Sequence, residues 1–222
     1  MNGGDPRDRL ALVRATNLPL LAYRDEAQAC TRCQDGGAIY KHNDTWARPL
    51  FDRHLNCPSG VLVVAEAPNF DDTFVEGKGY LTYDIESDPT GNFARELLAS
   101  VALTTTDVLF TNAVLCLPKA RDQRHPVTGK LMRACSPWLQ RLIDDVQPRV
   151  VATFGLKALS AVRLIEKHGL RKLADHAGKP VPWYGRQLLP LFHPGRLGRI
   201  SRSAAAQLAD IAVLRGLLAD KC

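Results

Sequence analysis

Four short apolar runs, each bounded by turn-forming residues, indicate the strands of this chain. They lie at residues 61–65, 108–112, 150–154 and 187–192, and few polar residues interrupt them. Such runs are typical of strands that are covered on both faces, as in a parallel sheet. We therefore predict a parallel sheet buried between layers of helices.

The segments between these runs carry apolar residues three to four positions apart, which is the spacing of an amphipathic helix. Strands that alternate with helices predict an α/β fold with right-handed crossovers. Residues 34–60 show no clear period, and we expect an irregular loop there. The pair Ser136-Pro137 should start or kink a helix that ends at Pro148. The other helices are expected over residues 7–30, 91–101, 156–167 and 204–218.

Length and charge narrow the class of protein. The 222 residues suit a single domain over residues 1–222, with an N-terminal segment (about 1–59) packed on it. No apolar stretch approaches the roughly 20 residues that span a bilayer, and charged residues precede the first apolar run. We expect no membrane segment, no secretory leader and a cytoplasmic protein. The net charge of +6 suits a polyanionic partner, although it is a weak indication by itself.

Polar side chains stand at the ends of three predicted strands. Glu66 follows the first, Asn112 ends the second and His193 follows the fourth. Each alone would be read as a cap, a turn or a surface charge. In an open α/β sheet, however, ligands bind beyond the carboxyl ends of the strands. Three polar groups at equivalent positions therefore predict a functional site at this edge.

Six cysteines in a reducing compartment argue against a disulfide framework. Four of them lie near helix ends or loops, and four thiolates are what a tetrahedral zinc ion or a 4Fe-4S cluster requires. The wide spacing of the second pair slightly favours a cluster over zinc, and Cys57 and Cys222 are left as free thiols. The four candidate ligands are Cys30, Cys33, Cys116 and Cys135.

The segment Gly77-Lys78-Gly79 is not a phosphate-binding loop. It lacks the Lys-Ser/Thr ending of a Walker loop and the third glycine of a dinucleotide fingerprint. We therefore expect no nucleotide cofactor.

Three segments together resemble the family 4 iron–sulfur enzymes of the uracil-DNA glycosylase superfamily. Residues 63–68 (VVAEAP) are similar to the Gly-Glu-Ala/Gly-Pro-Gly first motif of that family, and residues 111–118 (TNAVLCLP) to its Thr-Asn-x-x-Lys-Cys-x-Pro segment. Residues 183–185 (WYG) and 189–194 (LPLFHP) are similar to its second motif and the strand before it. With Cys30-x-x-Cys33, the resemblance extends over about residues 28–200.

The resemblance implies a three-layer α/β sandwich with a central four-stranded parallel sheet flanked by helices. It also implies a monomeric enzyme that removes uracil from DNA. One structural 4Fe-4S cluster would be held by Cys30, Cys33, Cys116 and Cys135.

By the same resemblance, Asn112 reads the pairing edge of the flipped base, and His193 donates to a uracil carbonyl as negative charge develops there. Glu66 would position the water or stabilise the cationic sugar, and Asp71 or Asp72 could supplement it.

The remaining implied contacts surround the base and the DNA. Ala67 and Pro68 of the first motif would bind the base, and Tyr80 would stack on it, with Phe70 and Tyr83 as the competing rings. Three residues after the His-Pro turn would fill the gap left by the flipped base and hold phosphates. They are Arg196, Leu197 and Arg199.

The chain departs from the family pattern at Asn69, at Leu115 and in the loop over residues 70–89. These changes leave three alternatives open. The fold could remove another damaged or modified base, such as a deaminated purine, or serve a non-catalytic iron–sulfur DNA-binding protein. The last alternative is an unrelated module stabilised by zinc.

Overall fold

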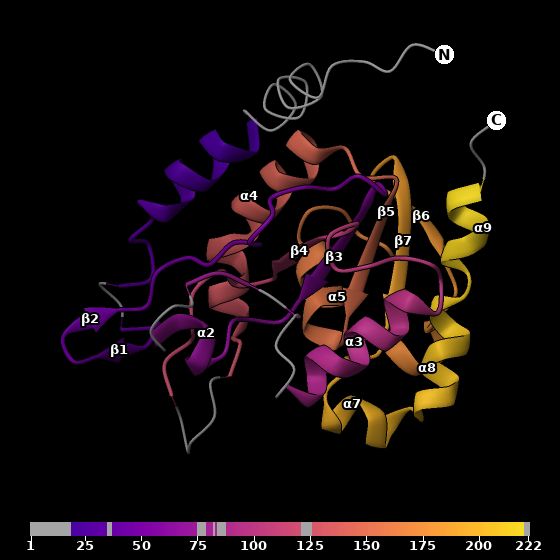
Figure 1. The fold of residues 1–222 in the computed structure, drawn as a ribbon. Coiled ribbons are helices and arrows are strands. Elements are labelled where there is room, and N and C mark those ends of the chain that lie inside the picture. Colours follow the sequence, from indigo (N-terminus) through magenta and orange to yellow (C-terminus); the bar gives the residue numbers. More distant parts are fainter. Residues whose placement is uncertain are drawn as a thin grey trace, which may run out of the picture.

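A central five-stranded sheet organises the fold (Figure 1). The structure is a computed structural model that describes residues 19–34, 37–74, 79–81, 83, 88–120 and 126–219, without the side chains of Asp71 and Asp72. The order of the strands is β4-β3-β5-β7-β6. Their bounds are β3 (Val61–Ala65), β4 (Leu109–Asn112), β5 (Val150–Phe154), β6 (Val181–Trp183) and β7 (Arg186–Leu191).

The four strands predicted from the apolar runs are present and parallel to one another. The sheet has one strand more than the four expected, because β6 pairs antiparallel with β7 at the edge. The α/β class is therefore confirmed, and the sheet is mixed. Its register places Ala65 opposite Asn112, so β3 and β4 end at the same level.

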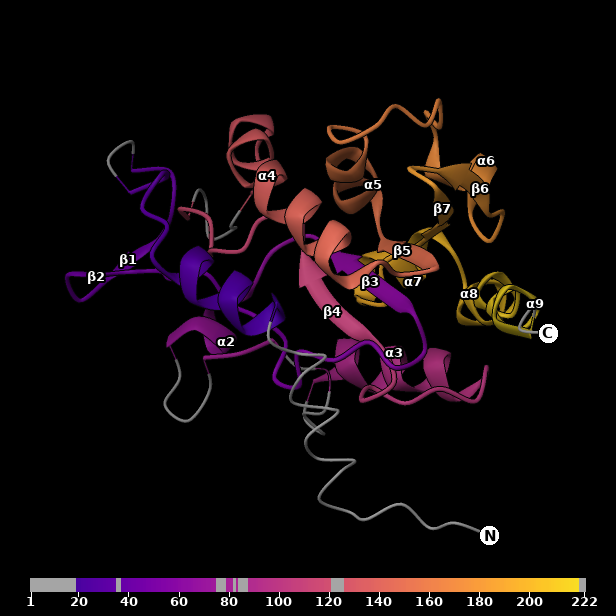
Figure 2. The same cartoon turned by 90° about the horizontal axis from the view of Figure 1, so that it is seen from above.

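Helices cover both faces of the sheet (Figure 2). One face is packed by α4 (Gly129–Val146), α5 (Leu156–Val162) and the helical residues 19–28. The other face is packed by α3 (Pro89–Ala99), α8 (Ala204–Ile211) and α9 (Leu214–Ala219). The expected three-layer sandwich is thus confirmed. The remaining elements are β1 (Lys41–His42), β2 (Thr45–Trp46), α2 (Phe70–Phe74), α6 (Leu173–His176) and α7 (Arg196–Ser201).

Helix α4 begins earlier than the sequence predicted. Its N-cap is Thr128, whose side chain accepts a hydrogen bond from the backbone of Leu131, and Pro137 lies inside the helix. A proline has no N–H to donate to the carbonyl four residues earlier, which is that of Arg133. The hydroxyl of Ser136 donates to this carbonyl instead, at 3.0 Å. The Ser-Pro pair is therefore accommodated within the helix and does not start it.

Two further elements differ from expectation. The segment expected as an irregular loop contains the antiparallel pair β1 and β2. The final predicted helix is divided into α8 and α9. Among the described residues, no helix has both the length and the apolar character needed to cross a membrane.

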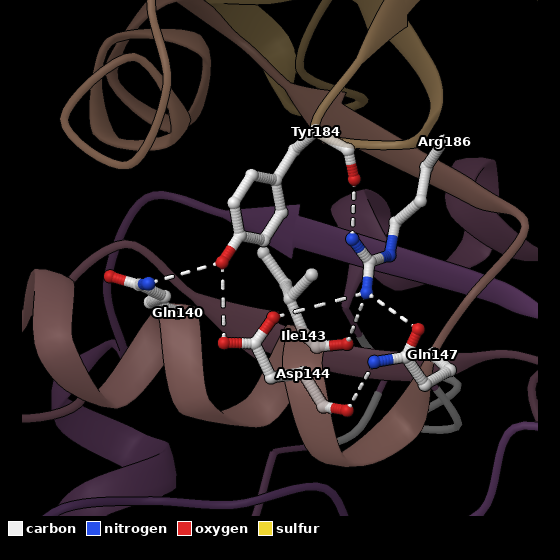
Figure 3. Close-up of polar contacts among 6 residues, drawn as sticks. All are labelled: Gln140, Ile143, Asp144, Gln147, Tyr184 and Arg186. Atoms are coloured by element: carbon white, nitrogen blue, oxygen red, sulfur yellow. Dashed lines mark hydrogen bonds and ion pairs between the residues drawn. The ribbon is translucent and has the colours of Figure 1, made fainter.

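A tight turn at Tyr184 and Gly185 joins β6 to β7. Both residues have positive φ, 48° and 69°, as a two-residue hairpin turn requires. The Tyr184 hydroxyl accepts from Gln140 at 3.1 Å and donates to Asp144 at 3.3 Å (Figure 3). Arg186 donates to the backbone carbonyl of Tyr184, to that of Ile143 on α4 and to the side chain of Gln147, the C-cap residue of α4. The turn is therefore fixed to α4 by polar contacts.

Candidate functional site

A pocket of about 210 Å³ opens at the carboxyl edge of the sheet. The ends of β3, β4 and β7 reach it, and α3 begins beside it. The polar residues at the ends of the predicted strands indicated a site at this edge of the sheet. Its lining residues are Ala67, Pro68, Asn69, Leu81, Tyr83, Asp88, Thr90, Phe110, Thr111, Asn112 and His193.

Asn112 occupies the last position of β4 and is only 4% exposed. Its amide can both donate and accept hydrogen bonds, so it can read a base edge that presents both kinds of group. Ala67 and Pro68 line the same pocket from the chain that leaves β3. The structure thus brings three of the predicted base-binding residues together.

His193 reaches the pocket from the end of β7, and its orientation is fixed by its own turn. The backbone N–H of Gly195 donates to Nδ1 of His193 at 3.0 Å. Burial lowers the pKa of His193, and the negative charge of Asp88 acts in the opposite direction. Because Nδ1 accepts a hydrogen bond, the neutral imidazole carries its proton on Nε2. His193 therefore offers an Nε2–H donor to a ligand.

The turn after His193 requires glycine at two positions. A Cβ on Gly195 would lie 2.8 Å from Nδ1 of His193, and one on Gly198 would lie 1.9 Å from its carbonyl oxygen. Both distances are shorter than any normal contact. A side chain at either position would displace the imidazole or the start of α7.

Among the described residues, the rings of Tyr83 and Phe110 line the pocket beside His193, with their centroids 4.6 Å apart. Tyr80 does not line it, and the guanidinium of Arg53 lies over the Tyr80 ring at 5.3 Å. Phe70 packs on Tyr40 outside the pocket. Of the three rings that the sequence offered for stacking, Tyr83 is the one placed to meet a base.

The carboxylates are arranged differently from the sequence prediction. Glu66 is half-buried but is not among the residues that line the pocket. Burial raises the pKa of Glu66, and the positive charge of Lys157 on α5 lowers it in part. Asp72 belongs to α2, and its side chain lies outside the described residues. Of the described residues, the carboxylate that lines the pocket is Asp88, which was not predicted from the sequence.

Helix α7 carries the predicted DNA contacts beside the pocket. Leu197 is 80% exposed and Arg196 is also exposed, whereas the guanidinium of Arg199 lies over the ring of Phe93 at 5.5 Å. A large apolar side chain so exposed next to a pocket is suited to meet a partner surface. The neighbouring Ile200, 72% exposed, extends this apolar tip.

The four candidate cysteine ligands line one small pocket between the N-terminal segment, the chain after β4 and α4. Cys30 and Cys33 are half-buried, and Cys116 and Cys135 are buried. Ile39, Leu115 and Trp138 supply apolar walls. Cys57 is elsewhere, with its thiol donating to the carbonyl of Val61 at 3.3 Å, and Cys222 lies outside the described residues.

The chemistry of this pocket fits an iron–sulfur cluster. Burial and the neighbouring thiols raise the pKa of Cys116, and burial raises that of Cys135 to about 11. Thiols gathered in this way need nearby positive charge to ionise, which a metal centre supplies. Within the described ranges, no group of three or more His, Cys, Asp or Glu side chains is arranged to hold a metal ion. Four thiols on one apolar pocket are nevertheless the donor set of a multi-iron cluster.

The comparison with known families agrees with this geometry. A model of the uracil DNA glycosylase superfamily matches residues 54–213. The chain therefore belongs to the uracil DNA glycosylase superfamily.

The curated relatives are more specific. A type-4 uracil-DNA glycosylase of Saccharolobus solfataricus is 27% identical over 183 residues, which cover 80% of this chain and 76% of the relative. A type-4 uracil-DNA glycosylase of Pyrobaculum aerophilum is 32% identical over 122 residues, 54% of this chain and 56% of the relative. A third, of Sulfurisphaera tokodaii, is 24% identical over 139 residues, 60% of this chain and 59% of the relative. The resemblance that the motifs indicated is confirmed.

Proposed function

We propose that this protein is a DNA glycosylase that hydrolyses the N-glycosidic bond of uracil in DNA and leaves an abasic site. Asn112 and His193 are 81 positions apart in the chain, yet both line one pocket at the carboxyl edge of the sheet. This observation carries the proposal. Similarity to proteins named type-4 uracil-DNA glycosylases supports uracil as the base. A base inside a duplex cannot reach such a pocket, so it must be flipped out.

The residues of the pocket divide the work on the flipped base. The Asn112 amide pairs with the donor and the acceptor on the uracil edge, while Tyr83 and Phe110 contact the ring. As the bond to the sugar breaks, its electron pair leaves with the base. The Nε2–H of His193 then donates to a uracil carbonyl oxygen on which negative charge grows, an interaction that strengthens in the transition state.

Residues of α7 would hold the DNA around the extruded nucleotide. Leu197, an exposed apolar side chain, fills the space that the base leaves in the duplex, much as apolar side chains of DNA-bending proteins insert between base steps. Arg196 and Arg199 neutralise neighbouring phosphates, and the net charge of +6 favours the approach to DNA. The role of Glu66 in positioning water stays a prediction.

We propose that Cys30, Cys33, Cys116 and Cys135 hold one 4Fe-4S cluster. The cluster would supply a structural crosslink between the N-terminal segment, the chain after Asn112 and α4. Changing Cys135 to Ser should abolish the bound iron and the visible iron–sulfur absorbance, whereas Cys57→Ser should retain both. Bound zinc without iron in the native protein would contradict this assignment.

The organisation of the chain is inferred in the same way. Leu20, Tyr23 and Ala27 of the N-terminal segment are buried in the same core cluster as residues of β3 and α4, which supports a single domain. The resemblance to the family supports a monomer as the active form. We place the enzyme in the cytoplasm.

The test is a panel of labelled oligonucleotides that each carry one altered base. Anaerobically purified protein should produce alkali-sensitive breaks at uracil opposite guanine, opposite adenine and unpaired. The cleavage rates should follow the ease with which uracil is flipped out, so uracil paired with adenine should be cleaved most slowly. Cleavage at hypoxanthine, xanthine or a modified pyrimidine but not at uracil would replace the proposed substrate. No cleavage of any of these bases by cluster-loaded protein would favour a non-catalytic role.

A further inference from the structure

A glycosylase must supply more than a binding site for the base, because water has to attack the sugar carbon that the base leaves. A carboxylate near that carbon can accept the proton of the water and stabilise the cationic sugar. Among the described residues that line the pocket, Asp88 is the one carboxylate. Glu66, which sequence similarity placed in this role, lies outside the lining and within the electrostatic influence of Lys157.

The position of Asp88 is fixed by its role as the N-cap of α3. One carboxylate oxygen accepts from the backbone N–H of Thr90 at 2.9 Å, and the other accepts from that of Gly91 at 3.0 Å. Each oxygen of a carboxylate has more than one lone-pair direction, so both can accept a further hydrogen bond. A Cβ on Gly91 would lie only 2.8 Å from the carbonyl oxygen of Tyr83 and 3.1 Å from Oδ2 of Asp88. The backbone is therefore packed closely around the carboxylate.

The start of α3, which carries Asp88, also adjoins the turn that orients His193. The hydroxyl of Thr90 lies 3.3 Å from where a Cβ on Gly195 would lie, and Gly195 belongs to the turn that orients His193. The charge of Asp88 is felt at the imidazole, since it opposes the effect of burial there. The start of α3 and the His193 turn therefore form adjoining walls of one cavity. One wall carries a donor for the leaving base, and the other carries a fixed negative charge.

We propose that Asp88 is the catalytic carboxylate that binds and deprotonates the attacking water, an inference that rests on the proposed glycosylase function. The bond between the sugar C1′ and the base N1 breaks, and its electron pair leaves with the base. The water oxygen forms a bond to C1′ and transfers its proton to the Asp88 carboxylate. That proton then passes to solvent, and the uracil anion takes a proton in turn. No oxidant, reductant or co-reactant other than water is required.

Asp88→Asn is the informative variant, because asparagine is also a favoured N-cap residue but carries no charge and accepts no proton. Its amide oxygen can keep one of the two backbone hydrogen bonds that Asp88 accepts, whereas its NH2 group cannot accept the other. We expect its single-turnover rate on uracil DNA to fall by about 10²- to 10⁴-fold, the usual contribution of a general base. The thermal unfolding midpoint should fall only modestly, because one of the two cap hydrogen bonds is lost, and the rate is therefore measured well below that midpoint. Binding to DNA that contains 2′-fluoro-2′-deoxyuridine, which resists cleavage, should also be retained.

Two comparisons separate catalysis from capping. Asp107→Asn is the matched control, because Asp107 also accepts a backbone hydrogen bond, from Thr104 at 2.7 Å, and does not line the pocket. This control should cleave uracil at the wild-type rate. In Asp88→Ala, added formate should restore part of the lost rate, since it can occupy the space of the missing carboxylate. A purely structural role predicts no such rescue.

The outcomes distinguish this proposal from the function on which it rests. Asp88→Asn activity within about threefold of the wild type would overturn the assignment of Asp88 and leave the glycosylase function standing. A larger loss in Glu66→Gln than in Asp88→Asn would return the role to Glu66. If the wild-type protein itself leaves every uracil substrate intact, the proposed function fails, and the role of Asp88 fails with it.

Discussion

The two ends of the parallel strands use polar side chains in opposite ways. At the amino end, Tyr184 and Arg186 bond to α4 (Figure 3), and the side chain of Arg186 is only 9% exposed. At the carboxyl end, Asn112 and His193 converge on a pocket of about 210 Å³. The first set fixes elements to one another, whereas the second set faces a space that a ligand can enter.

This difference shows how the fold separates stability from chemistry. Buried polar groups stabilise a structure only when their hydrogen bonds are made within it, and a group left for a ligand contributes little to the folded state. Variants at the two ends should therefore affect different observables. Substitutions of polar residues at the carboxyl end should lower the rate of uracil cleavage. Substitutions at the amino end should lower the free energy of unfolding.

Among the variants that compare the two ends, Asn112→Ala should have a large effect on the rate. Removing a group that reads the base and holds it for reaction should lower the single-turnover rate about 10²- to 10³-fold, the range measured when one preorganised donor is deleted. The urea midpoint should change little, because this amide faces the pocket. A large fall in stability with a near-native rate would reverse the roles assigned to the two ends.

At the opposite end, Arg186→Ala should destabilise the protein. Its guanidinium donates to the carbonyl of Ile143 at 3.2 Å and to the side chain of Gln147 at 3.0 Å, so its loss removes the hydrogen bonds by which this largely buried side chain joins β7 to α4. We expect a loss of about 1–3 kcal/mol in the free energy of unfolding, with uracil cleavage unchanged below the transition. Arg171→Ala, at an exposed arginine, is the control and should leave both quantities at their wild-type values.

A smaller effect is expected from Leu197→Ala on α7. If Leu197 fills the space of the flipped base, its truncation should slow cleavage of paired uracil by about tenfold or less and affect unpaired uracil less still. Leu164→Ala, 43% exposed and outside the pocket, provides the matched control. Equal losses on paired and unpaired substrates would exclude a role for Leu197 in flipping.

The smallest expected effect is on the pH dependence of stability. Burial lowers the pKa of His193 below its ordinary value of 6.5, so the unfolded chain binds this proton more readily than the folded protein. Stability should then fall as the pH drops below about 6.5, by less than about 1.4 kcal/mol per pH unit. Between pH 7 and 5, the free energy of unfolding measured in urea should fall less steeply in His193→Gln than in the wild type. Parallel curves for the two proteins would contradict this assignment.

The strands were predictable because burial on both faces demands an unbroken apolar run, which is visible in the residues of β3 and β5. The edge strand β6 was not, since it has three residues, one of them Pro182, and edge strands need no such run. The pair β1 and β2 has two residues in each strand, too few to show a period.

The residues of the site also differ in whether the sequence could predict them. Asn112 and His193 could be found because they follow predicted strands and the topology brings strand ends together. Asp88 was missed because the helix was predicted to begin at residue 91, although Asp88-Pro89 carries the signature of an N-cap followed by proline. Tyr80 was preferred to Tyr83 on the family resemblance alone. Which ring faces the pocket depends on the path of a loop that has no periodicity in its sequence.

The central claim is that the pocket at the carboxyl edge releases uracil from DNA. The most direct measurement is the amount of free uracil released in a single turnover from DNA with one uracil opposite guanine, for the wild type, His193→Ala and Arg186→Ala. We predict near-complete release of uracil by the wild type and by Arg186→Ala. In His193→Ala the rate should be at least about a hundredfold lower, which is the effect expected when one donor to a developing oxyanion is lost. Equal release by the wild type and His193→Ala would show that the chemistry takes place elsewhere.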